Sequence, residues 1–338
     1  MTQQPEIKDV ETLAARLRAG NRKALARAIT LVESTRDADR EFAERLLTRL
    51  LPYAGAALRI GISGAPGAGK STYIEALGAH VTGAGKMLAV LAVDPSSLRS
   101  GGSILGDKTR MVALARNPRS FIRPTPAGEV AGGVGRRTRE AVLLAEAAGF
   151  DLVIVETVGV GQSETAVSGM VDLFVLLVAP GSGDDLQGIK RGAMELADLV
   201  IVTKADGDLA PAATRTVADY RAALSLLRPK YPELPAHILE VSALEGAGIV
   251  QSWTAMEKTA EKLRAEGHLA RLREAQRRGW FWNEVRAELA EAMASDPAMA
   301  GESERLERAV AEGHSLPGAA ARALIRTFRR LDGANPRP

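Results

Sequence analysis

The residues best suited to carry chemistry run from Gly64 to Ser71, with the sequence Gly-Ala-Pro-Gly-Ala-Gly-Lys-Ser. This is the G-x-x-x-x-G-K-[ST] spacing of a P-loop, placed between an apolar run at 58–63 and a helix-like segment that opens at Thr72. Glycines let the backbone turn tightly and direct successive N–H groups at one anion, and the helix N-terminus adds its positive end. Lys70 would reach the terminal phosphates, and the Ser71 hydroxyl would bind Mg²⁺ between them. The pattern therefore predicts a nucleoside triphosphate site, rather than a glycine-rich turn without a ligand.

Two acidic residues stand at the ends of predicted strands. Asp94 ends the apolar run 87–94, and Glu156 ends the run 151–156. Because the carboxyl ends of parallel strands meet at one edge of a sheet, both carboxylates should lie near the P-loop, where they could bind Mg²⁺ directly or through water. Asp107, in a later loop, could reach the same ion. Helix capping or loop bracing is the alternative role for Asp94 and Glu156.

A third pattern predicts which base the nucleotide carries. Thr203-Lys204-Ala205-Asp206 has the form of the base-reading loop of GTPases, which is usually Asn-Lys-x-Asp. The Asp206 carboxylate can accept hydrogen bonds from the N1–H and 2-amino groups of guanine, and adenine offers neither donor. Thr203 replaces the Asn that commonly ties this loop to the P-loop, which predicts weaker affinity while the group that reads guanine is intact. Ser242-Ala243-Leu244 resembles the last GTPase loop, whose backbone N–H meets the guanine O6.

The elements that must position these loops alternate along the middle of the chain. Nearly continuous runs of Val, Ile and Leu predict strands buried on both faces of a parallel sheet, and helical stretches separate them. This alternation predicts an α/β fold with a doubly wound, mostly parallel sheet that binds its ligand beyond the C-terminal strand ends. The predicted strands are 58–63, 87–94, 151–156, 172–179, 198–203 and 237–242, and the predicted helices are 70–84, 129–148, 186–196 and 211–228.

Helical extensions are predicted on both sides of this domain. Apolar residues recur at three- and four-residue steps through 7–51, where Asn21 is suited to cap a second helix. The chain from 248 to its end is rich in Arg and Glu, with Gly301 and Pro317 predicted to break the later helices. The predicted domains are 1–55, an N-terminal helical extension; 56–250, the P-loop domain; and 251–338, a C-terminal helical arm.

Within that arm, Trp280-Phe281-Trp282 places three bulky aromatic side chains in a row. They cannot all face one side of a helix. Two interpretations remain open: an exposed cluster that forms a contact between two copies of the chain, or burial against the chain's own nucleotide domain.

Composition bounds the remaining possibilities. The chain has 338 residues, of which 46% are hydrophobic, but no apolar run long enough to cross a membrane. Its first residues lack the form of a signal peptide, and it has no cysteine, which excludes disulfides and thiolate metal sites and predicts a cytoplasmic location. The net charge of +3 is small, so nucleic-acid binding is not predicted.

Six motifs together carry a family resemblance: GAPGAGKST at 64–72, VDPSS at 93–97, ETVGVGQSE at 156–164, GSGDDLQGIKRG at 181–192, TKADGD at 203–208 and SALEG at 242–246. The set resembles the MeaB/ArgK family of P-loop GTPases, the G-protein chaperones of adenosylcobalamin-dependent methylmalonyl-CoA mutase. The resemblance implies a Mg²⁺-dependent GTPase that binds such a mutase, gates adenosylcobalamin loading and protects the mutase from inactivation. It also implies a homodimer formed through the C-terminal helices.

The site residues predicted from the motifs and the resemblance fall into four groups. Those that contact GTP or GDP are Gly64, Ala65, Pro66, Gly67, Ala68, Gly69, Lys70, Ser71, Thr72, Lys204, Asp206, Ser242, Ala243 and Leu244. Those with a catalytic role are Lys70, Asp94 and Glu156, and those in or near the Mg²⁺ shell are Ser71, Asp94, Asp107 and Glu156. By resemblance, a third switch loop runs from 181 to 190 and contains Asp184, Asp185, Gln187 and Lys190; from the residues alone it is a loop in which Asp184 or Asp185 caps a helix.

Other functions are weighed against this one. Related nickel and cobalamin-pathway GTPases carry Cys- or His-rich metal motifs, which this chain lacks. A kinase or ATPase acting on a small molecule or a transport protein is the alternative, although the sequence shows no distinct acceptor site or base.

Val160 stands where Ras-like GTPases place a Gln, and Gln162 lies two residues further on. Slow intrinsic hydrolysis is therefore predicted, completed when a partner orders the switch loops.

Overall fold

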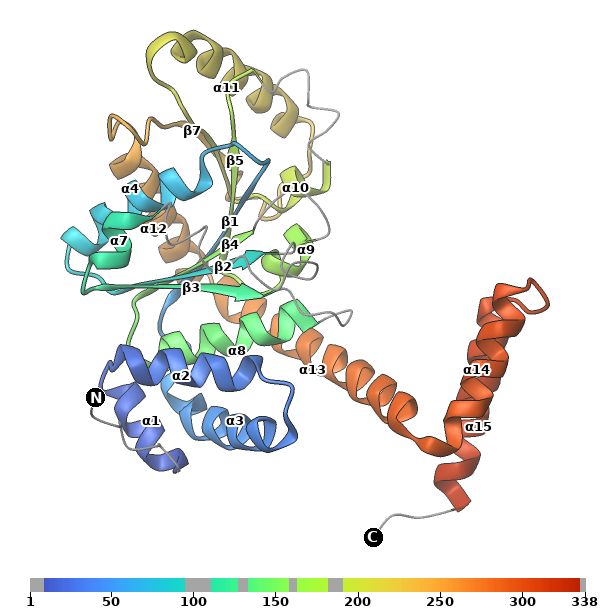
Figure 1. Cartoon of the computed structure of the whole chain (residues 1–338). Coiled ribbons are helices and arrows are strands. Elements are labelled where there is room, and N and C mark those ends of the chain that lie inside the picture. The colour runs from blue at the N-terminus through green and yellow to red at the C-terminus, as the bar shows by residue number, and fades with distance from the viewer. Residues whose placement is uncertain (1–8, 95–110, 127–132, 158–162, 182–190, 335–338) are drawn as a thin grey trace. The chain divides into compact units, whose positions relative to one another are not determined.

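The computed structural model describes residues 9–94, 111–126, 133–157, 163–181 and 191–334. These residues form a seven-stranded sheet in the order β3-β2-β4-β1-β5-β6-β7 (Figure 1). All of its neighbouring strands pair in parallel, so the predicted doubly wound fold is confirmed. The strands are β1 Leu58–Gly64, β2 Leu88–Asp94, β3 Ser120–Pro126, β4 Leu152–Thr157, β5 Leu173–Val178, β6 Leu199–Val202 and β7 His237–Glu240.

The central strands are buried because both of their faces are covered by helices. Every residue of β4 and β5 is buried, as the unbroken runs of Val, Ile and Leu predict. Burying one such side chain contributes about 1.5–3 kcal/mol, so these two strands supply much of the core.

Strand β3 was not predicted from the sequence. It carries Arg123, Pro124 and Pro126 in place of an apolar run, and a proline cannot donate a hydrogen bond to a neighbouring strand. Since β3 lies at one edge of the sheet and pairs only with β2 among the described strands, half of its backbone groups need no partner strand, and prolines are tolerated there.

Helices cover both faces of the sheet. Helices α4, α7 and α12 lie on one face, and α8, α9, α10 and α11 lie on the other (Figure 1). Helix α12 belongs to the core, because Trp253, Met256 and Leu263 pack in the same cluster as Ile60 of β1. The bounds are α4 Lys70–Gly83, α7 Val112–Arg116, α8 Gly133–Ala147, α9 Ser163–Ser168, α10 Arg191–Leu196, α11 Ala210–Ser225 and α12 Ile249–Ala265, with short 3-10 turns at Leu51–Tyr53 and Gly207–Leu209.

The N-terminal helices α1 Val10–Arg18, α2 Arg22–Glu33 and α3 Asp37–Leu50 pack together and against α8. The predicted cap is confirmed, because the Asn21 side chain accepts hydrogen bonds at 3.0 Å from the backbone N–H groups of Lys23 and Ala24.

Contacts divide the chain into one compact unit from Met1 to Gln276 and another from Arg277 to Pro338. Helix α13, His268–Ser295, begins in the first unit, and α14 Pro297–Ala311 packs on α15 Pro317–Ala334 in the second. The prediction that Gly301 breaks a helix is wrong: it lies inside α14, where an exposed glycine lowers helix stability without ending the helix. The predicted domain bounds at 55 and 250 stay predictions.

The N-terminal ends of the strands are held by buried ion pairs. Arg59 of β1 donates to both oxygens of Glu146 at 2.9 and 2.8 Å, and Arg273 of α13 donates to both oxygens of Asp172 at 2.8 and 2.6 Å. The Asp172 carboxylate also accepts from the backbone N–H of Arg59, at 2.8 Å. The side chains of Glu146 and Asp172 are 0% and 1% exposed. Each carboxylate has therefore lost its hydration, and the ion pair with arginine compensates for that loss.

Candidate functional site

The loop after β1 has the backbone conformation that the P-loop pattern predicts. Gly67 and Gly69 have φ angles of 80° and 82°, in the left-handed region that favours glycine. At Gly64 an added Cβ would lie 2.3 Å from the carbonyl oxygen of Leu177 in β5, so a larger residue would push the loop off the sheet. Helix α4 then begins at Lys70 with Gly69 as its N-cap, which leaves the first N–H groups of the helix facing this loop.

Lys70 lies back over its own loop. Its ammonium group donates to the carbonyl oxygens of Gly64, at 2.7 Å, and Ala65, at 3.1 Å, and the residue is 9% exposed. A buried ammonium group needs such partners because it has lost water. The same charge and three donors match the oxygens of a phosphate chain.

Ser71 and Glu156 meet across the end of the sheet. The Ser71 hydroxyl donates to the Glu156 carboxylate at 3.2 Å, and Glu156 is 3% exposed at the end of β4. One residue on, the Thr157 hydroxyl donates to the Ser63 hydroxyl at 2.8 Å and joins the ends of β4 and β1. This contact confirms the prediction that Glu156 lies near the P-loop. The Thr157–Ser63 bond was not predicted, since nothing in the spacing of these residues signals it.

The loop after β6 is tied to the P-loop through Thr203. Its hydroxyl lies 2.7 Å from the carbonyl oxygen of Ala68 and 3.1 Å from that of Val178, while its backbone N–H donates to Val178 at 2.9 Å. Thr203 is 2% exposed, so the hydroxyl depends on these partners. The tie to the P-loop that Asn commonly makes is therefore made here by threonine, and the predicted weaker affinity stays a prediction.

Asp206 is oriented by the loop after β7. The Ser242 hydroxyl donates to the Asp206 carboxylate and accepts a hydrogen bond from the backbone N–H of Glu245 at 3.1 Å. The chain reaches this position through Lys204, whose φ of 54° is the one positive value among the described residues other than glycine. Leu244 is 81% exposed, which leaves the loop surface open. The structure thus brings together the two loops that the sequence assigns to the base.

Several predicted residues are described only in part or not at all. The backbone of β2 places Asp94 at the strand end that adjoins β4, the strand of Glu156. Asp107, Val160, Gln162 and the switch-loop residues Asp184, Asp185, Gln187 and Lys190 lie outside the described residues.

Comparisons with known proteins agree with this geometry. The chain matches the family described as methylmalonyl Co-A mutase-associated GTPase MeaB over residues 25–298. A Caulobacter vibrioides protein named as a GTPase is 54% identical over 95% of this chain and 98% of its own length. The mouse protein named methylmalonic aciduria type A homolog, mitochondrial, is 46% identical over 96% of this chain and 80% of its own length. A crystal structure titled LAO/AO transport system kinase, 38% identical, covers 97% of this chain and 100% of its own, with a TM-score of 0.76. None of the helices that the structure describes has the length and hydrophobicity of a membrane span.

Proposed function

Because the chain belongs to the MeaB family of methylmalonyl-CoA mutase-associated GTPases and hydrolyses GTP, we propose that it gates the loading of adenosylcobalamin onto a mutase. The partner is methylmalonyl-CoA mutase or a related adenosylcobalamin-dependent acyl-CoA mutase, which the GTPase also protects from inactivation. Support comes from the family description and from the mouse relative, which is named after methylmalonic aciduria.

The observation that carries the nucleotide part of this proposal is the tethered base loop. Asp206 is held by Ser242, and its loop is fixed to the P-loop by the contact from Thr203 to Ala68. A carboxylate held in this way pairs with the two donors of guanine and would be left without a partner by adenine. Lys204, Ala243 and Leu244 would complete the base site, and residues 64–72 would hold the phosphates.

Magnesium fits the oxygen donors at the end of β4. The Ser71 hydroxyl and the Glu156 carboxylate, 3.2 Å apart, are the ligand types that this hard cation prefers. We propose that they hold Mg²⁺, with Asp94 and Asp107 in or near its shell. Bound there, the ion would neutralise charge on the phosphates, and Lys70 would add a second positive charge at the γ-phosphate. If Glu156→Ala hydrolyses GTP at the parent rate with unchanged Mg²⁺ dependence, this role for Glu156 is wrong.

A homodimer is proposed from the second unit. Phe281 and Trp282 are 60% and 57% exposed, and their rings meet edge to face with centroids 5.4 Å apart. Exposed aromatic side chains of this size are typical of subunit contacts. Sedimentation of the full chain should show a dimer, and Phe281→Glu with Trp282→Glu should give a monomer that still binds GDP.

A cytoplasmic location stays a prediction, and the mouse relative is named as mitochondrial.

The experiment that tests the proposal measures two quantities with the purified mutase from the same cells. The first is the rate of GTP turnover with and without the mutase. The second is cobalamin transfer to the apo-mutase, followed by absorbance, with GTP, GDP or a non-hydrolysable GTP analogue. We expect the mutase to accelerate GTP turnover, and the nucleotide state to change the rate of transfer.

Variants in the third switch loop sharpen this test. Gln187→Ala and Lys190→Ala should leave basal hydrolysis nearly unchanged, reduce the acceleration that the mutase produces and weaken nucleotide control of transfer. Full stimulation and normal gating in both variants would assign the coupling to another part of the chain. A mutase that neither binds the GTPase nor alters its turnover would contradict the proposal itself.

A second candidate function rests on the related crystal structure titled as a transport system kinase. Such a kinase would transfer the γ-phosphate to a small molecule or a protein instead of water. Incubation with γ-labelled GTP separates the two: release of free phosphate in the presence of candidate acceptors supports the GTPase proposal, and a labelled acceptor supports the kinase.

A further inference from the structure

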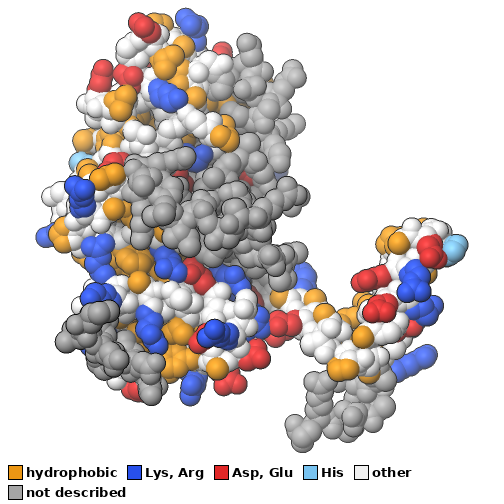
Figure 2. Space-filling view, in the orientation of Figure 1, with side chains coloured by type: hydrophobic (Ala, Val, Ile, Leu, Met, Phe, Trp, Pro, Cys, Tyr) orange, Lys and Arg blue, Asp and Glu red, His pale blue; other side chains and the backbone are white. Residues whose placement is uncertain are grey.

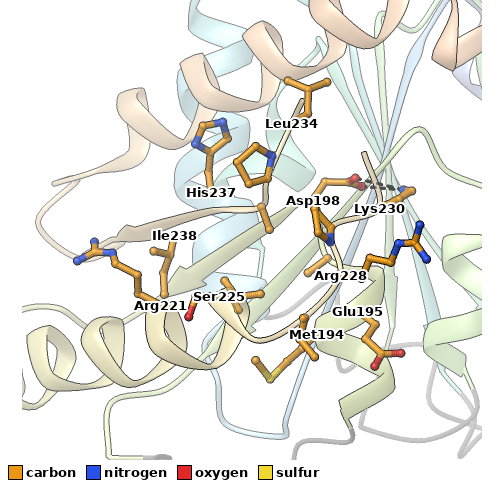
Figure 3. Close-up of a pocket in the computed structure, with 16 residues that line it drawn as sticks. Met194, Glu195, Asp198, Arg221, Ser225, Arg228, Lys230, Leu234, His237 and Ile238 are labelled. Atoms are coloured by element: carbon orange, nitrogen blue, oxygen red, sulfur yellow. Dashed lines mark hydrogen bonds and ion pairs between the residues drawn. The ribbon is translucent and has the colours of Figure 1, made fainter. Parts of the chain in front are cut away.

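A cavity of about 530 Å³ lies at the N-terminal ends of β6 and β7, and Figure 3 shows the residues that line it. Its walls are the two residues before β6, the first two residues of β7, residues near the ends of α10 and α11, and the segments 227–230 and 234–236. The base-reading loops follow the same two strands at their other ends. A strand of four residues spans roughly 13 Å, so the cavity and the guanine site are separate. Its volume lies within the range of small-molecule sites.

The chain segment that contains Lys230, Tyr231 and Glu233 is held by contacts to two other parts of the fold. Lys230 donates to both carboxylate oxygens of Asp198 at 3.2 Å, and the backbone N–H of Phe174 donates to the same carboxylate at 2.8 Å. Figure 3 shows the Lys230–Asp198 contact at one side of the cavity. Further along, the Tyr231 ring packs on the His268 ring with centroids 4.8 Å apart, and the His268 imidazole contacts Glu233. A wall fixed in this way needs little ordering when a ligand enters.

Glu233, Glu266 and His268 form a group near this wall that resembles a metal site, with ligand atoms within 4.8 Å of one another. Arg271 donates to the Nδ1 atom of His268 at 2.9 Å, so the other ring nitrogen carries the proton and donates to Glu233. The group is therefore a brace for the wall, and its imidazole is not poised to bind a cation.

The lining combines apolar surface with charged side chains, which are Glu195, Asp198, Arg221, Arg228 and Lys230. Met194, Leu224, Leu227, Leu234 and Ile238 supply apolar surface. Arg221 and Arg228 line the same cavity on opposite sides in Figure 3, and neither makes a hydrogen bond or ion pair with the part of the chain that the structure describes. The third cation, Lys230, is balanced by Asp198. Two arginines without partners beside apolar surface favour a ligand with an anionic head and an apolar body.

We propose that this cavity binds a small amphipathic carboxylate, with its hydrocarbon body against the Met194–Leu224 side and its head group on Arg221 or Arg228. This goes beyond GTP hydrolysis and mutase gating, and it holds whether or not the mutase is the partner. The planar guanidinium group of arginine pairs with a carboxylate through two parallel N–H bonds, which a neutral amide of the same shape cannot match.

The test uses octanoate and octanamide, which share one hydrocarbon chain and differ in charge. Isothermal titration calorimetry with the full chain should show saturable binding of one octanoate, and binding of octanamide weaker by about tenfold or more, the loss expected for a charge-assisted hydrogen bond. The double variant Arg221→Ala with Arg228→Ala should weaken octanoate binding by a similar factor. Both arginines are exposed, so the fold should be retained.

Two further variants keep the outcome decisive. Arg215→Ala removes an exposed arginine of α11 that does not line the cavity, and it should bind octanoate like the parent. Ala236→Trp should fill the cavity and abolish binding of both probes. Equal affinity for octanoate and octanamide, octanoate binding unchanged in the double arginine variant, or absence of saturable binding would each overturn the proposal.

Discussion

The central sheet uses polar side chains in opposite ways at its N-terminal edge, where the strands begin, and at its C-terminal edge, where the strands end. At the N-terminal edge, Arg59 and Arg273 each give two hydrogen bonds to a buried carboxylate. At the C-terminal edge, Lys70 holds two backbone carbonyls of its own loop, and Ser71 makes one bond to Glu156 at 3.2 Å. The first arrangement matches charge with charge, so the polar groups of these two ion pairs are occupied by each other. In the second, the contacting side chains are ones whose chemistry suits a phosphate group and a cation.

This difference separates residues that hold the fold from residues that await a ligand. A buried carboxylate that loses its arginine is still without its hydration and no longer has a compensating charge, so the free energy of unfolding should fall. Removing Lys70 removes two hydrogen bonds within one loop, and we expect its main effect on nucleotide turnover. Substitutions at the two edges should therefore divide between stability and turnover.

The largest effect is expected at Lys70. Lys70→Ala should lower GTP turnover by about 100- to 1,000-fold, the loss typical of removing one preorganised donor from developing charge. A single-turnover assay measures it. Without nucleotide, the midpoint of thermal unfolding should change far less than in the Arg273 variant below. A hydrolysis rate equal to that of the parent would break the comparison at its catalytic side.

The largest effect on stability is expected at Arg273. Arg273→Ala should lower the free energy of unfolding by about 3–5 kcal/mol, because the buried Asp172 carboxylate loses its charged partner and keeps the backbone N–H of Arg59. Denaturant unfolding followed by circular dichroism measures this loss. The matched control is Arg305→Ala, which breaks an exposed pair with Glu302 and should cause no measurable change. Similar losses in the two variants would remove the distinction between buried and exposed pairs.

A smaller and pH-dependent loss is expected at Lys230. Burial raises the pKa of Asp198, so protonation of this carboxyl group favours the folded chain at acid pH, and that contribution fades as the pH rises through the folded pKa. Removing Lys230 takes away the charge that opposes this shift. Lys230→Met should therefore cost about 2 kcal/mol near neutral pH.

The same variant should show a smaller deficit in acid. Thermal unfolding midpoints of parent and Lys230→Met, compared at about pH 8 and about pH 5, should differ most at the higher pH. An equal deficit at the two pH values would show that Lys230 acts through packing and not through the Asp198 charge.

The smallest effect is expected at Thr203. Thr203→Val keeps the shape of the side chain and removes the donor to Ala68, which should weaken GDP binding by about tenfold, the worth of one buried hydrogen bond. Thr203→Ser keeps the hydroxyl and should bind like the parent. Fluorescence titration with a labelled GDP distinguishes the two. Equal affinity in Thr203→Val would mean that the contact holds the loop without serving the nucleotide.

The C-terminal edge could be predicted from the sequence because its signals are local. The P-loop spacing, Glu156 at a strand end and the Thr203–Asp206 loop each lie within a few residues, and the parallel topology brings them to one edge. The contact from Thr203 to Ala68 could not be predicted, because the reach of a side chain depends on how closely two loops approach.

The N-terminal edge could not be predicted in this way. Arg59 and Glu146 are 87 positions apart, and Asp172 and Arg273 are 101 positions apart, so no spacing pairs them. Strand β3 was hidden for another reason, because Pro124 and Pro126 are tolerated only where the strand has an open edge. The break between α12 and α13 at Gly267, where φ is 72°, was also missed in a stretch of strong helix formers.

Exchange of base preference at Asp206 tests the central claim most directly, which is that the C-terminal edge reads guanine. Displacement of a labelled nucleotide gives the affinities of the parent and of Asp206→Asn for GDP, ADP and xanthosine diphosphate. The parent should bind GDP at least about 100-fold more tightly than ADP, because adenine would leave the carboxylate unpaired. In Asp206→Asn the preference should move to xanthosine diphosphate, whose 2-carbonyl accepts a hydrogen bond from the new amide. Equal affinity of the parent for ADP and GDP, or a GDP preference that Asp206→Asn leaves unchanged, would contradict the account.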